Sequence, residues 1–185
     1  MKQSANIQKL MDHLTNTVYE GMLKLGGMTD ETFSIYYDLD LLNYLLETDF
    51  TSNQSCEAFL NSAEDSLQIG GCQIIVSLEK GRFRFQAPRA SLTMIYAKGE
   101  QHGFLRDIIG LASTHHYTLD DVKEVFEKYS KDYMCEEIDH PEFQYVLYFK
   151  DEAINHYKYC FTFDAFGGYY HRLLDYDYQK ALAEN

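Results

Sequence analysis

The chain has 185 residues, a net charge of −13 at pH 7, 16 tyrosines and 12 phenylalanines, but no tryptophan. This length fits one domain, and 45% hydrophobic with 24% charged residues is a globular rather than a disordered composition. The strong negative charge argues against nonspecific binding to nucleic acid or to an anionic membrane, because both are polyanions.

The first part of the chain alternates between helix and strand patterns. Apolar residues recur at helical spacing over residues 7–25, which predicts a first helix. Residues 33–37 alternate as a short strand does, and Asp38 can cap a second helix that runs to Leu46. A third helix is expected over about 56–67.

A β-hairpin is predicted next, with strands near 74–78 and 83–85. Its turn is expected to be the three residues Glu79-Lys80-Gly81, with the glycine in the left-handed conformation. Residues 89–98 fit either a strand or a short helix.

Helices are then expected over 104–112 and 118–129, the second opened by Thr118 and Asp121 as a capping box. The remainder is rich in strands, which we place near 132–138, 143–149, 157–164 and 169–174. A short helix from Asp175 closes the chain. Consecutive hairpins predict an α+β fold in a single domain over residues 1–185. It has one antiparallel sheet and about five helices packed mainly on one face.

Neither export nor a membrane span is indicated. Residues 1–14 lack the continuous apolar run of a signal peptide, and no segment approaches the roughly 18 apolar residues that a membrane span needs. The cysteines show no C-x-x-C pair and no zinc-module spacing, so we expect reduced thiols, no metal and no cofactor. A cytoplasmic protein is predicted. The four cysteines are Cys56, Cys72, Cys135 and Cys160.

Three stretches resemble a bacterial family of about this length, known from gut anaerobes of the Firmicutes and described only as a domain of unknown function. They are residues 20–46 (EGMLKLG…ETFSIYYDLDLLNYLL), 125–130 (VFEKYS) and 145–173 (YVLYFKDEAINHYKYCFTFDAFGGYYHRL). The resemblance covers nearly the whole chain, and its motifs are aromatic and structural rather than catalytic. It implies a bacterial cytoplasmic protein and supplies no activity, cofactor or catalytic residue.

Charge is segregated along the sequence. Residues 25–79 contain ten acidic residues and no Lys or Arg, whereas residues 80–98 contain five basic residues and no acid. Period-two alternation places Arg82 and Arg84 on one face of the hairpin, where two guanidiniums about 7 Å apart can hold a carboxylate or phosphate. The alternative is a solvated strand face, or one that pairs with nearby acids.

The C-terminal hairpin carries a second group of candidates. A turn centred between Phe166 and Gly167 would place Thr162 opposite His171 and Cys160 diagonal to it, the minimum for a Cys-His nucleophile pair. A buried thiol beside a polar strand histidine is the structural alternative.

Further along this strand, Tyr169, Tyr170 and Arg172 can line an aromatic pocket, with Arg172 stacked on a ring. Core tyrosines and a sheet-edge charge are the alternative. The candidate ligand-binding residues are Arg82, Arg84, Tyr170, His171 and Arg172.

No phosphate loop, G-x-G-x-x-G, H-E-x-x-H or G-x-S-x-G signature occurs. The leading hypothesis is therefore a non-enzymatic binding protein with a protein partner, rather than nucleic acid or membrane, because tyrosine suits interface cores. A second hypothesis is a small-molecule enzyme or sensor with an anion pocket at Arg82 and Arg84. A third is an acidic decoy that fills the nucleic-acid groove of a basic protein.

Overall fold

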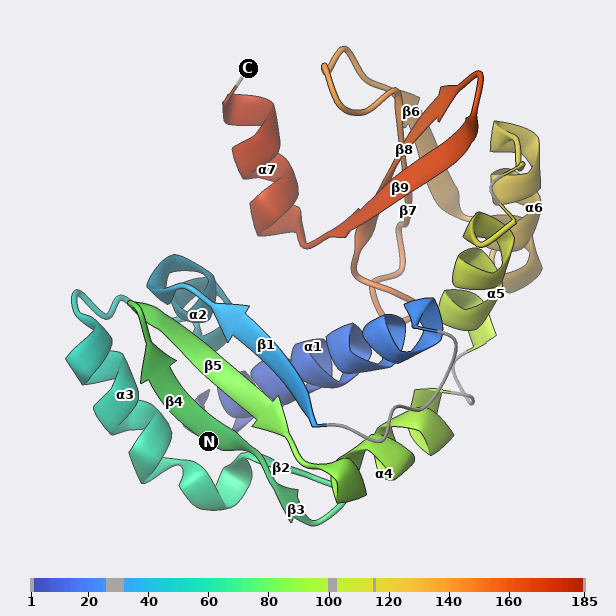
Figure 1. The fold of residues 1–185 in the computed structure, drawn as a ribbon. Coiled ribbons are helices and arrows are strands. Elements are labelled where there is room, and N and C mark those ends of the chain that lie inside the picture. Colours follow the sequence, from blue (N-terminus) through green and yellow to red (C-terminus); the bar gives the residue numbers. More distant parts are fainter. Residues whose placement is uncertain (1, 26–31, 100–102, 115, 185) are drawn as a thin grey trace. The chain divides into compact units, whose positions relative to one another are not determined.

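A computed structural model describes residues 2–25, 32–99, 103–114 and 116–184. The chain divides into two compact units, residues 1–102 and 103–185 (Figure 1). That residues 1–185 form one domain stays a prediction. The described residues form seven α-helices, one 3-10 helix and three antiparallel sheets, which confirms a mixed helix and antiparallel-strand fold. Among these residues, no helix is long and apolar enough to cross a membrane.

The first unit combines a three-stranded sheet with a long helix and several shorter ones. Its helices are α1 (Lys2–Lys24), α2 (Leu39–Leu46), α3 (Asn53–Ser62), η1 (Glu64–Ser66) and α4 (Arg89–Gly99). Its strands are β1 (Phe33–Tyr37), β2 (Gln68–Ile69), β3 (Cys72–Gln73), β4 (Ile75–Glu79) and β5 (Arg82–Ala87). The larger sheet has the order β1-β5-β4, and β2 pairs with β3.

Alternation along β5 separates an apolar face of this sheet from a polar one. Phe83 and Phe85 are fully buried, and the Phe85 ring lies 5.3 Å from that of Tyr37 in β1. The Tyr37 ring in turn lies 5.5 Å from His13 of α1, so α1 covers the apolar face. The opposite face carries the hydroxyl, amide and charged side chains of the three strands.

Two local predictions in this unit need correction. Glu79 pairs directly with Arg82, so the turn has two residues, Lys80 and Gly81, rather than three. Their φ angles of 51° and 82° are both positive, as a two-residue hairpin turn that matches strand twist requires. Residues 89–98, left open between strand and helix, form α4, whose buried residues Leu92 and Ile95 are spaced for one helical face.

The second unit is a meander of hairpins with three helices. The helices are α5 (Gly103–Ala112), α6 (Leu119–Tyr129) and α7 (Asp175–Ala183). The strands are β6 (Tyr133–Glu137), β7 (Tyr145–Phe149), β8 (Lys158–Asp164) and β9 (Gly167–Leu173). They pair in sequence order, β6-β7-β8-β9, as consecutive hairpins predict.

Helices cover both faces of this sheet, whereas one covered face was predicted. On one face, the Phe104 ring of α5 lies 4.9 Å from Phe149 and 5.3 Å from Tyr159. On the other, Tyr178 of α7 joins the buried cluster around Cys160. The short closing helix therefore completes a second apolar layer. In place of one sheet with about five helices on one face, the described residues form three sheets and seven α-helices.

Candidate functional site

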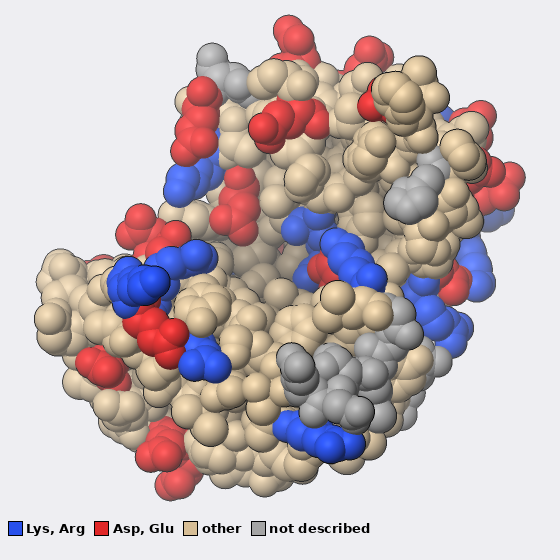
Figure 2. Space-filling view, viewed as in Figure 1, with Lys and Arg blue, Asp and Glu red and all other residues tan. Residues whose placement is uncertain are grey.

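The two candidate arginines lie on the same face of β5, as predicted. Arg84 Nη1 is 2.9 Å from Glu79 Oε1, and Arg84 Nε donates to Ser34 Oγ at 3.1 Å. Arg82 Nη2 donates to the carbonyl oxygen of Tyr36 at 2.9 Å. In Figure 2, basic and acidic side chains lie next to one another over the β4–β5 end of this sheet. Any anion there has to compete with acceptors that the sheet itself supplies.

Electrostatics in this network favours the ion pair. The hydrogen bond from Arg84 holds the pKa of Glu79 below its ordinary value, and bonds from Ser77 and Tyr36 act in the same direction. The same contact raises the pKa of Arg84. Both groups therefore stay charged at neutral pH. The anion site remains a prediction. An anion that binds to Arg84 would have to displace the Glu79 carboxylate.

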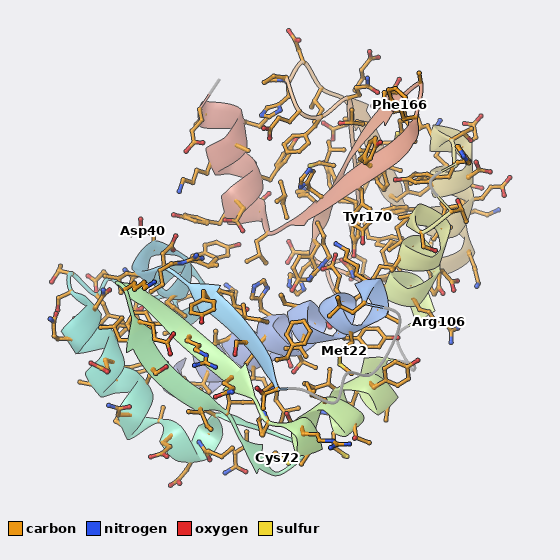
Figure 3. The ribbon with its side chains drawn as sticks, in the orientation of Figure 1. Met22, Asp40, Cys72, Arg106, Phe166 and Tyr170 are labelled. Carbon is orange, nitrogen blue, oxygen red and sulfur yellow. The ribbon has the colours of Figure 1, made fainter. Side chains whose placement is uncertain are left out.

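The three candidates on β9 alternate between the two faces of the second sheet. Tyr170 lies opposite Phe161, 5.8 Å away between ring centroids, on the face covered by α5 and α6 (Figure 3). Arg172 shares that face, and its guanidinium carbon lies 3.9 Å from the centre of the Tyr157 ring. His171 points to the other face. The structure thus groups Tyr170 with Arg172 and separates both from His171.

Register in this hairpin differs by two residues from the predicted one. Asp164 pairs with Gly167, so the turn is centred between Ala165 and Phe166, and Cys160 lies directly opposite His171. Cys160 is completely buried, and burial raises the pKa of its thiol to about 12. A thiol that is protonated at neutral pH is a poor nucleophile, which favours the structural interpretation of Cys160.

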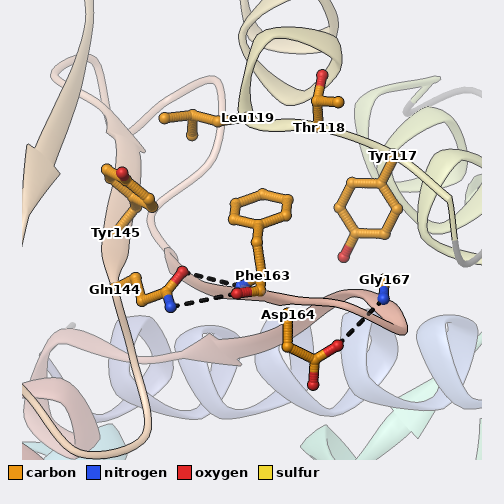
Figure 4. A pocket seen from close by; sticks show the side chains of 8 residues that line it. All are labelled: Tyr117, Thr118, Leu119, Gln144, Tyr145, Phe163, Asp164 and Gly167. Carbon is orange, nitrogen blue, oxygen red and sulfur yellow. Dashed lines mark hydrogen bonds between the residues drawn. The ribbon is translucent and has the colours of Figure 1, made fainter.

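A pocket in the second unit was not predicted from the sequence. It has a volume of about 390 Å³ and lies where the loop before α6 meets the β8–β9 hairpin (Figure 4). This size falls within the range of small-molecule sites. Aromatic rings form much of its wall. Its lining residues are Tyr117, Thr118, Leu119, Gln144, Tyr145, Phe163, Asp164 and Gly167.

Tyr117 is positioned by the start of α6. The predicted capping box is present: Asp121 N donates to Thr118 Oγ1 at 3.3 Å, and Thr118 N donates to Asp121 Oδ2 at 2.7 Å. This reciprocal pair fixes the backbone immediately after Tyr117. The ring then packs edge-on against Phe163, with centroids 5.7 Å apart. It also lies against Gly168, where an added Cβ would come within 2.5 Å of Tyr117 Cζ.

The hydroxyl of Tyr117 is the unusual polar group in this pocket. The residue is only 5% exposed, and its oxygen has no hydrogen-bond partner among the residues that the structure describes. In Figure 4 the oxygen points toward the hairpin turn at Asp164 and Gly167. Burial raises the pKa of Tyr117 to about 12, so the hydroxyl keeps its proton at neutral pH.

Gln144 and Asp164 hold the hairpin side of the pocket in place. Gln144 donates from Nε2 to the Phe163 carbonyl at 3.2 Å and accepts from Phe163 N at 2.9 Å, replacing the sheet pairing that ends at Tyr145. Asp164 Oδ1 accepts from the backbone N–H groups of Phe166 and Gly167 at 2.7 and 3.1 Å. Its second oxygen makes no hydrogen bond or ion pair with any described residue.

A second hollow of about 580 Å³ lies between α5 and α6. Part of its charge is paired within the lining. Lys128 forms an ion pair with Asp107, and Tyr129 donates to the same carboxylate at 2.7 Å. Burial alone raises the pKa of Asp107, but the bonds from Lys128 and Tyr129 outweigh it and hold the pKa below its ordinary value. None of the residues that line this hollow carries a buried polar atom without a hydrogen-bond partner, whereas the Tyr117 pocket has one among the described residues.

Sequence reasoning missed the pocket because its parts come from separate segments. The capping box showed where α6 begins, and period-two alternation placed Tyr145 and Phe163 on strands. Neither pattern shows that Tyr117 meets a hairpin more than forty positions later. One sequence feature could have located the turn. Asp164 shortly precedes Gly167 and Gly168, and Asp side chains accept hydrogen bonds from backbone N–H groups in turns.

The fold is that of an α+β protein with an aromatic-lined pocket in its second unit. A family model described as "Domain of unknown function, E. rectale Gene description (DUF3877)" matches residues 7–182. The chain therefore belongs to that family, which confirms the resemblance noted in the sequence. No curated protein and no solved structure matches the chain.

Proposed function

We propose that the chain is a non-enzymatic binding protein that takes a small ligand in the Tyr117 pocket. The observation that carries this proposal is the buried Tyr117 hydroxyl, which has no hydrogen-bond partner among the described residues. Most buried polar groups in folded proteins are hydrogen-bonded, so such an exception calls for a physical reason. A ligand atom that completes the hydrogen bond supplies that reason.

The cost of the unmet hydroxyl supports this interpretation. Leaving a buried hydroxyl without a partner costs about 1–3 kcal/mol, whereas phenylalanine would fill the same space without that cost. Tyrosine at this position therefore lowers the stability of the unliganded protein. Binding that satisfies the oxygen recovers this free energy, which is the thermodynamic pattern expected of a ligand site.

The lining favours binding over catalysis. Both polar groups of the Gln144 amide are engaged by Phe163, and Tyr117 is no general base at neutral pH because its pKa is raised to about 12. Asp164 uses one oxygen to hold the hairpin turn. These groups recognise and orient a molecule more readily than they transfer its protons.

The test is a thermal-shift screen of the full chain against amines, carboxylates, phosphates, nucleotides and neutral aromatic compounds. A ligand at about a hundred times its dissociation constant adds about 2.7 kcal/mol to the free energy of unfolding, which raises the melting temperature measurably. Tyr117→Phe should abolish or strongly reduce the shift. Tyr169→Phe is the matched control, because Tyr169 is 50% exposed on β9 and lies outside the pocket lining.

Two outcomes oppose the proposal: no compound of any class shifts the melting temperature, or a shift survives unchanged in Tyr117→Phe. The second result would mean that the ligand binds without using the Tyr117 hydroxyl. A shift with phosphate or carboxylate that disappears in an Arg82→Ala/Arg84→Ala variant would instead favour the anion-site hypothesis. The protein-partner and acidic-decoy hypotheses remain predictions beside it.

A further inference from the structure

We propose, resting on the function proposed above, that the ligand of the Tyr117 pocket carries a protonated amine. The inference joins three features of the lining: aromatic rings set at steep angles, a carboxylate with one oxygen unused, and a buried hydroxyl that can accept an N–H donor. Each feature is satisfied by an ammonium group, whereas a neutral or an anionic group leaves at least one of them unmet.

The rings provide cation-binding faces. Phe163 lies between two tyrosines, with its centroid 5.7 Å from that of Tyr117 and 6.2 Å from that of Tyr145. The interplanar angles are 75° and 58°, so the three rings form walls of a hollow rather than a flat stack. All three rings line the pocket, so an ammonium group that enters it comes against aromatic π-systems, which attract cations.

Charge at the pocket has one sign. None of the eight described lining residues is basic, and Asp164 is the acidic one among them. A second carboxylate, Asp121, is bonded to the lining residue Thr118. The segment from 103 to 185 as a whole contains twice as many acidic as basic residues. This field attracts a cation and repels a carboxylate or phosphate.

The Tyr117 hydroxyl and the Asp164 carboxylate both lie at the hairpin turn. Tyr117 Oη points toward the turn that Asp164 closes, as Figure 4 shows. An ammonium N–H can donate to the phenol oxygen while a second donates to the carboxylate, in a charge-assisted hydrogen bond. Because the phenol oxygen is covered in the structure, neighbouring atoms have to shift when the ligand enters.

The test uses isothermal titration of the full chain with three probes of similar size. Phenethylamine is protonated at neutral pH, 2-phenylethanol is neutral and phenylacetate is anionic. We expect phenethylamine to bind at least about tenfold more tightly than 2-phenylethanol, with phenylacetate weakest. Tetramethylammonium, which has a charge but no N–H donor, should bind more weakly than phenethylamine. Added salt should weaken amine binding and leave binding of the alcohol unchanged.

Asp164→Asn removes the negative charge at the turn but keeps the hydrogen bonds that close it, because asparagine also has an Oδ1 acceptor. It should weaken phenethylamine binding about tenfold and leave 2-phenylethanol binding unchanged. Asp151→Asn is the matched control: Asp151 is also exposed and accepts a backbone N–H, from Ala153 at 3.0 Å, but lies outside the pocket. The melting temperature of each variant checks that the hairpin still folds.

The outcomes distinguish this inference from the function on which it rests. Tighter binding of the alcohol or the acid than of the amine, lost in Tyr117→Phe, would overturn the amine inference and leave the binding function intact. Amine binding that is equally strong in Asp164→Asn would overturn it as well. Absence of binding by every probe and by every class in the wider screen would overturn both.

Discussion

The polar face of the first sheet and the pocket of the second unit differ in whether their polar groups have hydrogen-bond partners. On the first sheet, Arg82 and Arg84 are exposed or half-buried, yet both donate to acceptors of neighbouring strands. In the pocket, Tyr117 is almost completely buried and its hydroxyl has no described partner. The region that is richer in charge is therefore the one with fewer unmet interactions.

The difference teaches where to look for a site. Exposed charges are common, and surface ion pairs contribute little to stability, so two arginines on a strand face carry little information about ligands. A buried group without a partner is rare and costly. Residue type drew attention to Arg82 and Arg84, whereas burial and hydrogen bonding draw it to Tyr117.

The largest effect should come from adding a side chain at Gly168, whose backbone lies against the rings of Tyr117 and Phe163. In Gly168→Ala, the new Cβ would lie 2.5 Å from Tyr117 Cζ and 3.0 Å from Phe163 Cε1. Both rings have to move, which should lower the free energy of unfolding by about 1–3 kcal/mol and weaken ligand binding. Urea denaturation and the ligand titrations measure these two changes.

Gly110→Ala is the control for this substitution, because an added Cβ at Gly110 meets nothing within 4 Å. Gly110 lies inside α5, where alanine should stabilise the helix by roughly 0.5–1 kcal/mol. Equal effects of the two substitutions would mean that Gly168 is not needed for the close approach of Tyr117.

Local patterns predicted most elements of both regions. The strand at 33–37 and the meander of the second unit follow from period-two alternation, and the Thr118 capping box is confirmed together with the start of α6. These features depend on residues within a few positions of one another. Local physical chemistry is sufficient to specify them.

Longer-range features could not be predicted in the same way. β1 pairs with β5 across about fifty residues, and this pairing brings Ser34 to Arg84. The β8–β9 register depends on which two residues form the turn, and Asp164 closes it two residues earlier in register than predicted. Because a two-residue slip keeps each side chain on its face, the faces were predicted correctly although the partners were not.

A smaller effect should separate two tyrosine hydroxyls of the second unit, the half-buried one of Tyr129 and the buried one of Tyr117. Tyr129 donates to Asp107 at 2.7 Å, so Tyr129→Phe should lower the free energy of unfolding by roughly 1 kcal/mol. Tyr117→Phe removes a hydroxyl with no described partner and should leave stability unchanged or slightly higher. Paired urea denaturation of the two variants measures the contrast, and a clear loss in Tyr117→Phe would reveal a hydrogen bond at Tyr117.

The smallest effect concerns the closed network of the first sheet and its dependence on pH. The bond from Arg84 lowers the pKa of Glu79 in the folded state. The stabilisation is therefore complete above the ordinary glutamate pKa of about 4.3 and is lost as the pH falls through the lower, folded value. The difference in urea midpoint between the natural chain and Glu79→Gln should be largest near about pH 7 and should decrease as the pH falls below the ordinary glutamate pKa of about 4.3. Arg84→Gln should show the same pH dependence, and the double variant should lose little more, because both single substitutions break one ion pair. A midpoint difference that stays constant with pH would mean that Glu79 and Arg84 do not stabilise each other, and the arginines would then be available to bind an anion.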